Sequence, residues 1–183
     1  MPAKRASRKN AIAKTSAATK SAPTASRPHM PGYISAGSKG LLAWTWAERR
    51  LRNSREYWIA TTRPDGAPHV MVVWGLWWDE TFCFSTGRQS RKARNLDANP
   101  RCVICNEDAD EAVIVEGVAE RMRDVRKIRE FLSIYERKYK FDMSGMAGGM
   151  TSLKEPVFVV RPKVVFGQAE KTFAKTATRW RFG

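Results

Sequence analysis

The chain has 183 residues, 43% of them hydrophobic, and a formal net charge of +15 at pH 7. This length suits one domain with a substantial core, and no stretch is long and apolar enough to predict a membrane span. Seven of the basic residues lie before residue 30, where Asp and Glu are absent, so the body is only moderately basic and nucleic-acid binding is not its expected role.

The N-terminal segment is rich in Ala, Ser, Thr and Lys. This composition buries too little apolar surface to offset the entropy of ordering, which predicts a disordered basic tail over residues 1–35 and a folded domain over residues 36–183. Contact between the tail and nucleic acid stays an alternative. The tail lacks the apolar core of a secretion signal, so we expect reduced thiols and a cytoplasmic location.

The first half of the domain has the pattern of one helix followed by hairpins. Alternating aromatic and β-branched residues indicate strands, and an Asp-Gly turn separates the first two of them. On the second strand, alternation places Trp74 and Trp78 on one face and Trp77 on the other. The predicted elements are a helix over residues 40–53 and strands over residues 57–62, 69–78 and 81–84.

The second half continues with hairpins and two helices. The predicted elements are a helix ending before Pro100, strands over residues 101–106 and 112–119, a helix capped by Asp124, a mobile Gly- and Met-rich loop over residues 143–150, strands over residues 157–160 and 163–166, and an aromatic, cationic end over residues 176–182. Hairpins outnumber β-α-β units, so the pattern favours a closed or partly closed antiparallel barrel of about six strands over a doubly wound sheet.

The turn before the helix that ends at Pro100 has the composition of a phosphate site. Ser85, Thr86 and Ser90 supply hydroxyl donors, and Arg91 and Lys92 supply positive charge. A helix N-terminus also presents unpaired N–H groups and the positive end of its dipole. The alternative is an ordinary capped surface helix with solvated basic residues.

Several short motifs occur in an informative order. They are Asp65-Gly66-Ala67-Pro68-His69-Val70, Ser85-Thr86 with Ser90-Arg91-Lys92, Asn95-Leu96, Asn99-Pro100-Arg101 and Val115-Glu116-Gly117 with Ala119-Glu120. In order and spacing they resemble the pyridoxamine 5′-phosphate oxidase-like family, also called the flavin/deazaflavin split-barrel oxidoreductases. The resemblance spans residues 40–182 and implies a six-stranded antiparallel split barrel of the FMN-binding type, which forms a homodimer with the cofactor between the subunits.

The resemblance also implies roles for particular residues. FMN is the expected cofactor, with a deazaflavin coenzyme as the alternative. The residues that match the family's phosphate site are Ser85, Thr86, Ser90, Arg91 and Lys92, and those that would run along the flavin ring are Met71, Val72, Val73 and Trp74. An aromatic residue of the partner subunit near the C-terminus often closes the site, which points to Trp180.

The chain departs from the members that oxidise pyridoxamine phosphate. Those enzymes have an Arg and a Lys where this chain has Met71 and Leu76, and an Arg-x-His pair where it has Arg179-Trp180-Arg181. The departures point to the broader branch of the family, with a small apolar or conjugated molecule as substrate.

No catalytic residue or metal site is predicted. Cys102 and Cys105 match C-x-x-C, but three residues apart on a strand their thiols face opposite ways, and the chain has only two His. Since no nucleophile with a base and no carboxylate pair stands out, we expect the cofactor to carry the chemistry. The sequence thus predicts a flavin-dependent oxidoreductase. The alternatives are a deazaflavin-dependent reductase or a non-catalytic binder of flavin, haem or another tetrapyrrole.

Overall fold

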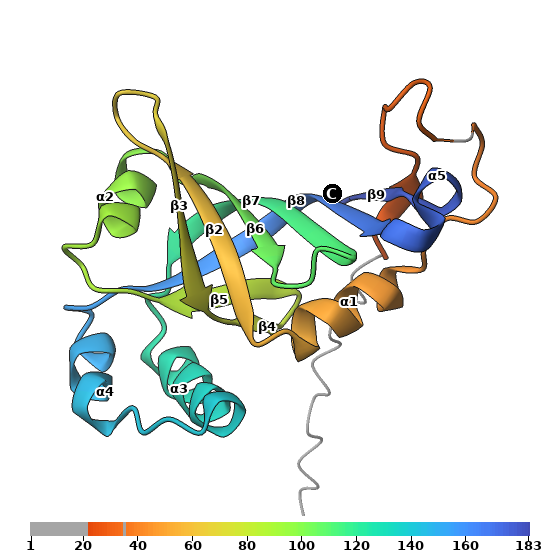
Figure 1. The fold of residues 1–183 in the computed structure, drawn as a ribbon. Coiled ribbons are helices and arrows are strands. Elements are labelled where there is room, and N and C mark those ends of the chain that lie inside the picture. The colour runs from red at the N-terminus through yellow and green to blue at the C-terminus, as the bar shows by residue number, and fades with distance from the viewer. Residues whose placement is uncertain (1–21, 35) are drawn as a thin grey trace, which may run out of the picture.

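The computed structural model describes residues 22–34 and 36–183. Within them, an antiparallel sheet of nine strands curls around a hydrophobic core, with helices at its ends (Figure 1). The strands are β1 (Thr24–Ser26), β2 (Glu56–Thr62), β3 (Pro68–Trp74), β4 (Leu76–Trp78), β5 (Thr81–Ser85), β6 (Arg101–Asn106), β7 (Glu111–Arg121), β8 (Val157–Ala169) and β9 (Thr178–Arg181). The helices are α1 (Trp44–Asn53), α2 (Arg91–Ala98), α3 (Val125–Tyr139), α4 (Ser144–Thr151), the 3-10 helix η1 (Glu170–Thr172) and α5 (Phe173–Thr176).

The sheet is curled but not closed. Strands β3, β2, β6, β7 and β8 pair in that order, and β8 pairs on its other side with β5 along its first part and with β9 along its second. Among the described residues, strand β3 pairs only with β2, so the sheet stays open between β3 and β5. The predicted mainly β split barrel is confirmed, and its sheet has more strands than expected because the short β1, β4 and β9 extend it.

The predicted strand over residues 69–78 is broken at Gly75. A Cβ on Gly75 would lie 2.8 Å from Cε2 and 2.9 Å from Cε1 of Phe82, so the close packing of that ring requires glycine. The face assignment survives the break: Trp77 packs in the barrel core, while Trp74 and Trp78 pack against the second cluster described below.

The two strands predicted over residues 157–160 and 163–166 form the single strand β8. Pro162 lies within it opposite Gly117, where the register between β7 and β8 shifts. Proline has no N–H for the ladder and is accommodated at such bulges. A Cβ on Gly117 would lie 2.6 Å from the carbonyl oxygen of Arg161, so glycine allows the two strands to approach.

The Gly- and Met-rich segment over residues 143–150 is mostly helical, which corrects the predicted loop. Met143 and Met150 are buried in a cluster with residues of α3, and the Met143 amide donates to Oε1 of Glu136 at 3.0 Å. These tertiary contacts stabilise a helix that contains three glycines.

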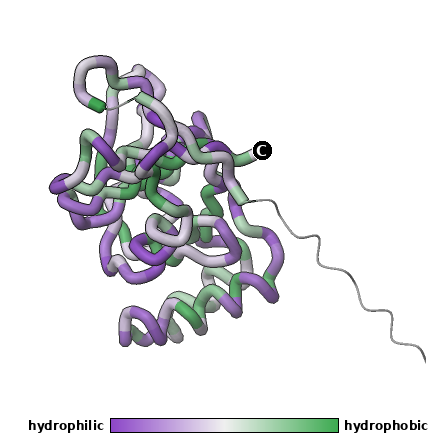
Figure 2. Tube along the Cα trace, turned by 90° about the vertical axis from the view of Figure 1, so that its right-hand side faces the viewer, coloured by the Kyte–Doolittle hydropathy of each residue, from purple (hydrophilic) through white to green (hydrophobic). Residues whose placement is uncertain are grey.

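Two hydrophobic clusters make up the interior. The first fills the barrel, and the second lies between the barrel and helices α3 and α4. Figure 2 shows hydrophobic segments gathered inside the molecule and hydrophilic ones around them. As predicted, Asp124 caps α3, because its carboxylate accepts from the Arg126 amide at 2.9 Å.

The tail boundary predicted at residue 35 is wrong for part of the segment. Strand β1 pairs with β9, and the guanidinium of Arg27 donates to four main-chain carbonyls, those of Gly37, Lys39, Lys175 and Ala177. Composition alone does not predict that residues 22–34 are ordered, because their order comes from contacts with the distant C-terminal strand. Residues 1–21 lie outside the described residues, so there the disordered tail stays a prediction.

Candidate functional site

The turn between β5 and α2 brings the predicted hydroxyl residues together. Ser90 is the N-cap of α2, and its Oγ accepts from the Ala93 amide at 3.2 Å. Oγ1 of Thr86 lies 3.1 Å from that same Oγ, and Ser85 ends the preceding strand. An ordered Ser/Thr turn therefore directly precedes the first turn of α2, where free N–H groups can bind an oxyanion.

Two cations stand at the start of α2. Arg91 is exposed, whereas Lys92 is half-buried and its pKa is lowered by desolvation. Within the part of the chain that the structure describes, neither side chain makes an ion pair. A half-buried ammonium without a counter-ion is an incomplete arrangement that a bound anion would complete.

A buried hydrogen bond fixes α2 to the barrel. Asn95 is fully buried and its Nδ2 donates to Oγ1 of Thr61 on β2 at 3.0 Å. That hydroxyl lies 3.4 Å from Nδ1 of His69, its neighbour across the β2–β3 pair. The connection of His69 to α2 through Thr61 was not predicted from the sequence.

His69 lies among positive charges. Partial burial lowers its pKa, and so do the charges of Arg63, Lys92 and Arg91, in that order. These four groups come from three segments: the turn after β2, strand β3 and helix α2. We call Arg63, His69, Arg91 and Lys92 the cation cluster.

Strand β3 forms the open edge of the sheet next to this cluster. Met71 pairs with Ile59, so both side chains lie on the inner face of the sheet. Ile59 is fully buried there, whereas Met71 is 47% exposed. The barrel interior is therefore accessible beside β3, where no other strand of the described residues pairs with it. Val73 is 7% exposed and packs in the barrel core, so only its main chain can face a ligand.

An apolar pocket of about 700 Å³ lies between the barrel and the helices α3 and α4. It reaches the turn before α2 at Ser85, Thr86 and Gly87. Its other lining residues are Trp74, Tyr135, Phe141, Met143, Gly145, Met146, Gly149, Met150 and Glu155. Glu155 is the only charged residue among them, and its carboxylate accepts from the Arg88 amide at 2.7 Å. The aromatic and methionine lining was not recognised from the sequence.

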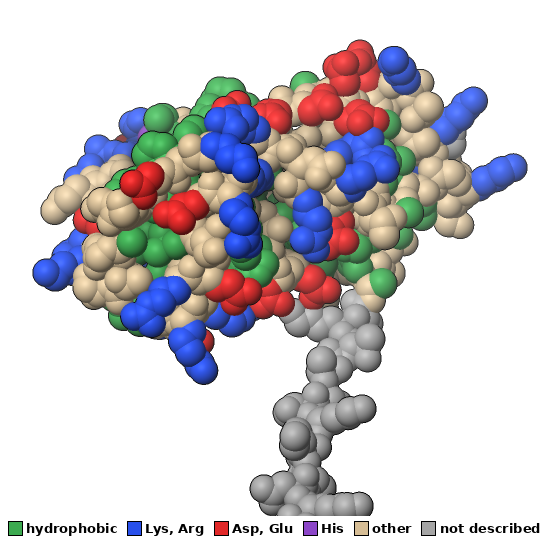
Figure 3. Space-filling model, turned by 90° about the horizontal axis from the view of Figure 1, so that it is seen from below, with side chains coloured by type: hydrophobic (Ala, Val, Ile, Leu, Met, Phe, Trp, Pro, Cys, Tyr) green, Lys and Arg blue, Asp and Glu red, His purple; other side chains and the backbone are tan. Residues whose placement is uncertain are grey.

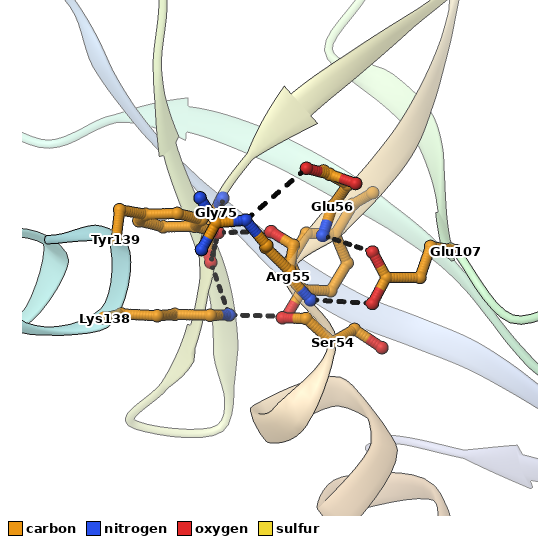
Figure 4. A network of polar contacts seen from close by, with 8 residues as sticks. Ser54, Arg55, Glu56, Gly75, Glu107, Lys138 and Tyr139 are labelled. Carbon is orange, nitrogen blue, oxygen red and sulfur yellow. Dashed lines mark hydrogen bonds and ion pairs between the residues drawn. The ribbon is translucent and has the colours of Figure 1, made fainter. Parts of the chain in front are cut away.

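A polar network holds one wall of this pocket (Figure 4). Trp74 stacks on Tyr139 with ring centroids 4.5 Å apart and planes 2° from parallel. The Tyr139 hydroxyl accepts from the Gly75 amide at 2.8 Å and lies 2.7 Å from the Arg55 carbonyl oxygen. Lys138 donates to the Gly75 carbonyl at 3.0 Å and to the Tyr57 hydroxyl at 2.9 Å, and desolvation lowers its pKa to about 8. Helix α3 thus fixes the end of β3.

Trp180 does not belong to this site, which corrects its predicted role. It is 1% exposed in the barrel core and contacts Trp44 of α1 edge to face, with centroids 5.5 Å apart. Strand alternation points Trp180 inward and Arg179 and Arg181 outward. Because its indole fills its own barrel, it is not available to a partner subunit.

Within the described residues, no helix is long and apolar enough to cross a bilayer. The same residues contain no group of three or more His, Cys, Asp and Glu that could hold a metal ion.

Comparisons with known proteins agree with this geometry. The family described as pyridoxamine 5′-phosphate oxidase matches residues 43–169. A pyridoxine/pyridoxamine 5′-phosphate oxidase from Anaeromyxobacter dehalogenans (strain 2CP-C) is 40% identical over 78 residues, which is 41% of this chain and 39% of that protein. The match therefore spans well under half of the relative's length.

Two solved structures extend the similarity to the fold. An F420 reductase is 26% identical, with a TM-score of 0.53 over 64% of this chain and 94% of its own. A conserved hypothetical protein from Mycobacterium tuberculosis is 21% identical, with a TM-score of 0.62 over 81% of this chain and 90% of its own.

Proposed function

The chain belongs to the pyridoxamine 5′-phosphate oxidase family, and from this premise we propose that it is an FMN-dependent oxidoreductase. It would transfer hydride equivalents between the flavin and a small apolar or conjugated substrate. The observation that carries the proposal is Lys92, a half-buried cation without an ion-pair partner in the described residues, placed at the start of α2 beside the open edge of β3.

The residues present fit a flavin phosphate and ring. The phosphate would be held by the N-terminal amides of α2 together with the side chains of Ser85, Thr86, Ser90, Arg91 and Lys92. The ring would lie along the main chain of β3 from Met71 through Val72 and Val73 to Trp74. No strand in the described part of the chain covers the outer edge of β3. When bound, the flavin supplies the hydride chemistry, while the protein positions the reactants and excludes water.

The apolar pocket supports the proposed substrate class. Its aromatic and methionine side chains suit a planar apolar molecule, and its single charged residue, Glu155, is acidic. A substrate carrying its own phosphate would meet no cation among the residues that line the pocket. Leu76 occupies the position at which the family members that oxidise pyridoxamine phosphate have a Lys. Its side chain is 3% exposed. We therefore do not propose pyridoxamine phosphate as the substrate.

A homodimer is part of the proposal. The outer face of β2 and β3 exposes Trp58, Val70 and Val72 by 49%, 50% and 43%. A hollow of about 420 Å³ continues this surface over β6 and β7, where Val103 and Val118 line it. A second copy would remove this apolar area from water. The face seen in Figure 3, below the barrel in Figure 1, instead has interspersed acidic and basic side chains.

A deazaflavin-dependent reductase is the second candidate, favoured by the similarity to the F420 reductase. We also propose a cytoplasmic location, since the cysteines Cys83, Cys102 and Cys105 are all free and reduced thiols are typical of that compartment.

The test begins with an absorbance spectrum of the purified protein and mass spectrometry of any released ligand. The apoprotein is then titrated with FMN and with a deazaflavin, and the loaded protein is assayed for reduction and reoxidation with panels of apolar quinones and nitroaromatics. We expect FMN to bind and to turn over. Preferred binding of the deazaflavin would support the second candidate, and binding without turnover would support a non-catalytic carrier. Failure to bind either coenzyme would refute the proposal.

A further inference from the structure

His69 lies where three segments of the chain meet. It stands on β3 opposite Thr61 of β2, and the charges that bear on it are those of Arg63, Lys92 and Arg91. All three are positive, and within the described residues none of them forms an ion pair. The surroundings of His69 therefore have uncompensated positive charge contributed by the β2–β3 turn as well as by α2.

The Thr61 hydroxyl can serve His69 in either protonation state. Its oxygen accepts from Nδ2 of Asn95 at 3.0 Å, and lies 3.4 Å from both Nδ1 and the carbonyl oxygen of His69. When Nδ1 is unprotonated, the hydroxyl can donate to it. When Nδ1 carries a proton, the ring donates to the hydroxyl, which can turn toward the carbonyl oxygen. Nε2 has no partner among the described residues.

We propose that His69 and Arg63 extend the phosphate site from α2 onto the β2–β3 hairpin, and that His69 takes up a proton when a phosphoryl oxyanion binds there. The proposal deepens the proposed function and rests on it only for the identity of the anion. The proton comes from solvent and is bound by the imidazole, while the phosphoryl oxygen remains an acceptor. His69 and Arg63 are thus binding residues of the same site as Lys92.

The direction of the coupling follows from charge. In the free protein, the three neighbouring cations disfavour the imidazolium, so the pKa of His69 lies below its usual value. A bound dianion offsets those charges and favours the imidazolium. Binding therefore raises the pKa of His69, and relative to a variant without His69 the native protein gains affinity as pH falls through the range between the two pKa values.

Nuclear magnetic resonance of the full chain tests this directly. The chain has two histidines, so a His29→Gln variant assigns the imidazole signals of His69. These are titrated with pH in buffer alone, with inorganic phosphate and with FMN. We expect phosphate and FMN each to raise the pKa of His69 by about one unit, the lower end of the effect of an opposite charge at close range.

Matched variants separate a specific site from general charge. Arg63→Gln should raise the pKa of His69 in the free protein and weaken phosphate binding several-fold. Arg129→Gln removes the same charge from an exposed position on α3 and should change neither. His69→Gln should retain the native melting temperature, and its FMN affinity should be lower than native at about pH 6 and converge on native by about pH 8.

The outcomes also distinguish this inference from the proposed function. If FMN binds but the pKa of His69 does not change, and His69→Gln binds FMN as tightly as native at every pH, the inference is overturned and the flavin proposal stands. If phosphate raises the pKa but FMN does not bind, the anion site stands and the flavin proposal fails. If neither ligand affects His69, the inference is wrong.

Discussion

Replacing Lys92 with glutamine should weaken FMN binding without weakening the fold. A hydrogen bond to a charged group contributes about 1.5–3 kcal/mol. At about 1.4 kcal/mol per tenfold change, the loss corresponds to a rise in the FMN dissociation constant of about 10- to 150-fold. Because Lys92 is half-buried and has no ion-pair partner in the described residues, little of this interaction should be replaced by neighbouring groups.

The same substitution should affect stability in the opposite direction. Desolvation lowers the pKa of Lys92 in the folded protein, which means that its charged form is disfavoured there relative to the unfolded chain. Glutamine removes this penalty, so the free energy of unfolding of the apoprotein should stay the same or rise slightly. A variant that simply misfolds would lose both affinity and stability.

Quenching of FMN fluorescence at constant ionic strength measures the affinity, and urea denaturation of the apoprotein measures the stability. Arg94→Gln is the matched control, because Arg94 is an exposed cation on the same helix whose side chain makes no ion pair in the described residues. An FMN affinity within twofold of native for the double variant Arg91→Gln, Lys92→Gln would refute the reasoning and leave the start of α2 as an ordinary capped helix.

Four further predictions concern stability. Trp180→Ala should lower the free energy of unfolding, measured in urea, by about 3–5 kcal/mol, because it leaves a cavity in the barrel core. A loss of no more than about 0.5 kcal/mol, which is typical of exposed positions, would contradict its burial. Gly75→Ala should lower it by at least about 1–3 kcal/mol through overlap with Phe82, and native stability for this variant would show that the break in the strand tolerates a side chain. Arg27→Ala should speed amide hydrogen exchange in β1, since four carbonyl contacts are lost; unchanged exchange would mean that strand pairing alone holds β1. Lys138 binds its proton less tightly in the folded protein, with a pKa lowered from 10.5 to about 8, so native stability should rise between those pH values and Lys138→Met should flatten the rise.

Much of the local structure could be predicted from the sequence because it depends on residues close together in the chain. Asp124 caps its helix as predicted, and Asp65 and Gly66 form the expected turn, with φ of Gly66 at 84°. The alternation that separates Trp77 from its neighbours also follows from strand geometry alone. In the candidate site, the same local chemistry predicted the Ser/Thr turn and the cations at the start of α2.

Tertiary structure decided the features that depend on residues distant in sequence. Periodicity shows that Trp180 faces the opposite way from Arg181, but not that α1 covers the inner face and leaves the indole no access to a partner. Periodicity also shows that Met71 faces inward, but not that the sheet stays open beside β3. The connection of His69 to α2 passes through Thr61, 34 residues from Asn95 in sequence. The burial and charge that govern pKa values and pocket lining arise only when such segments pack together.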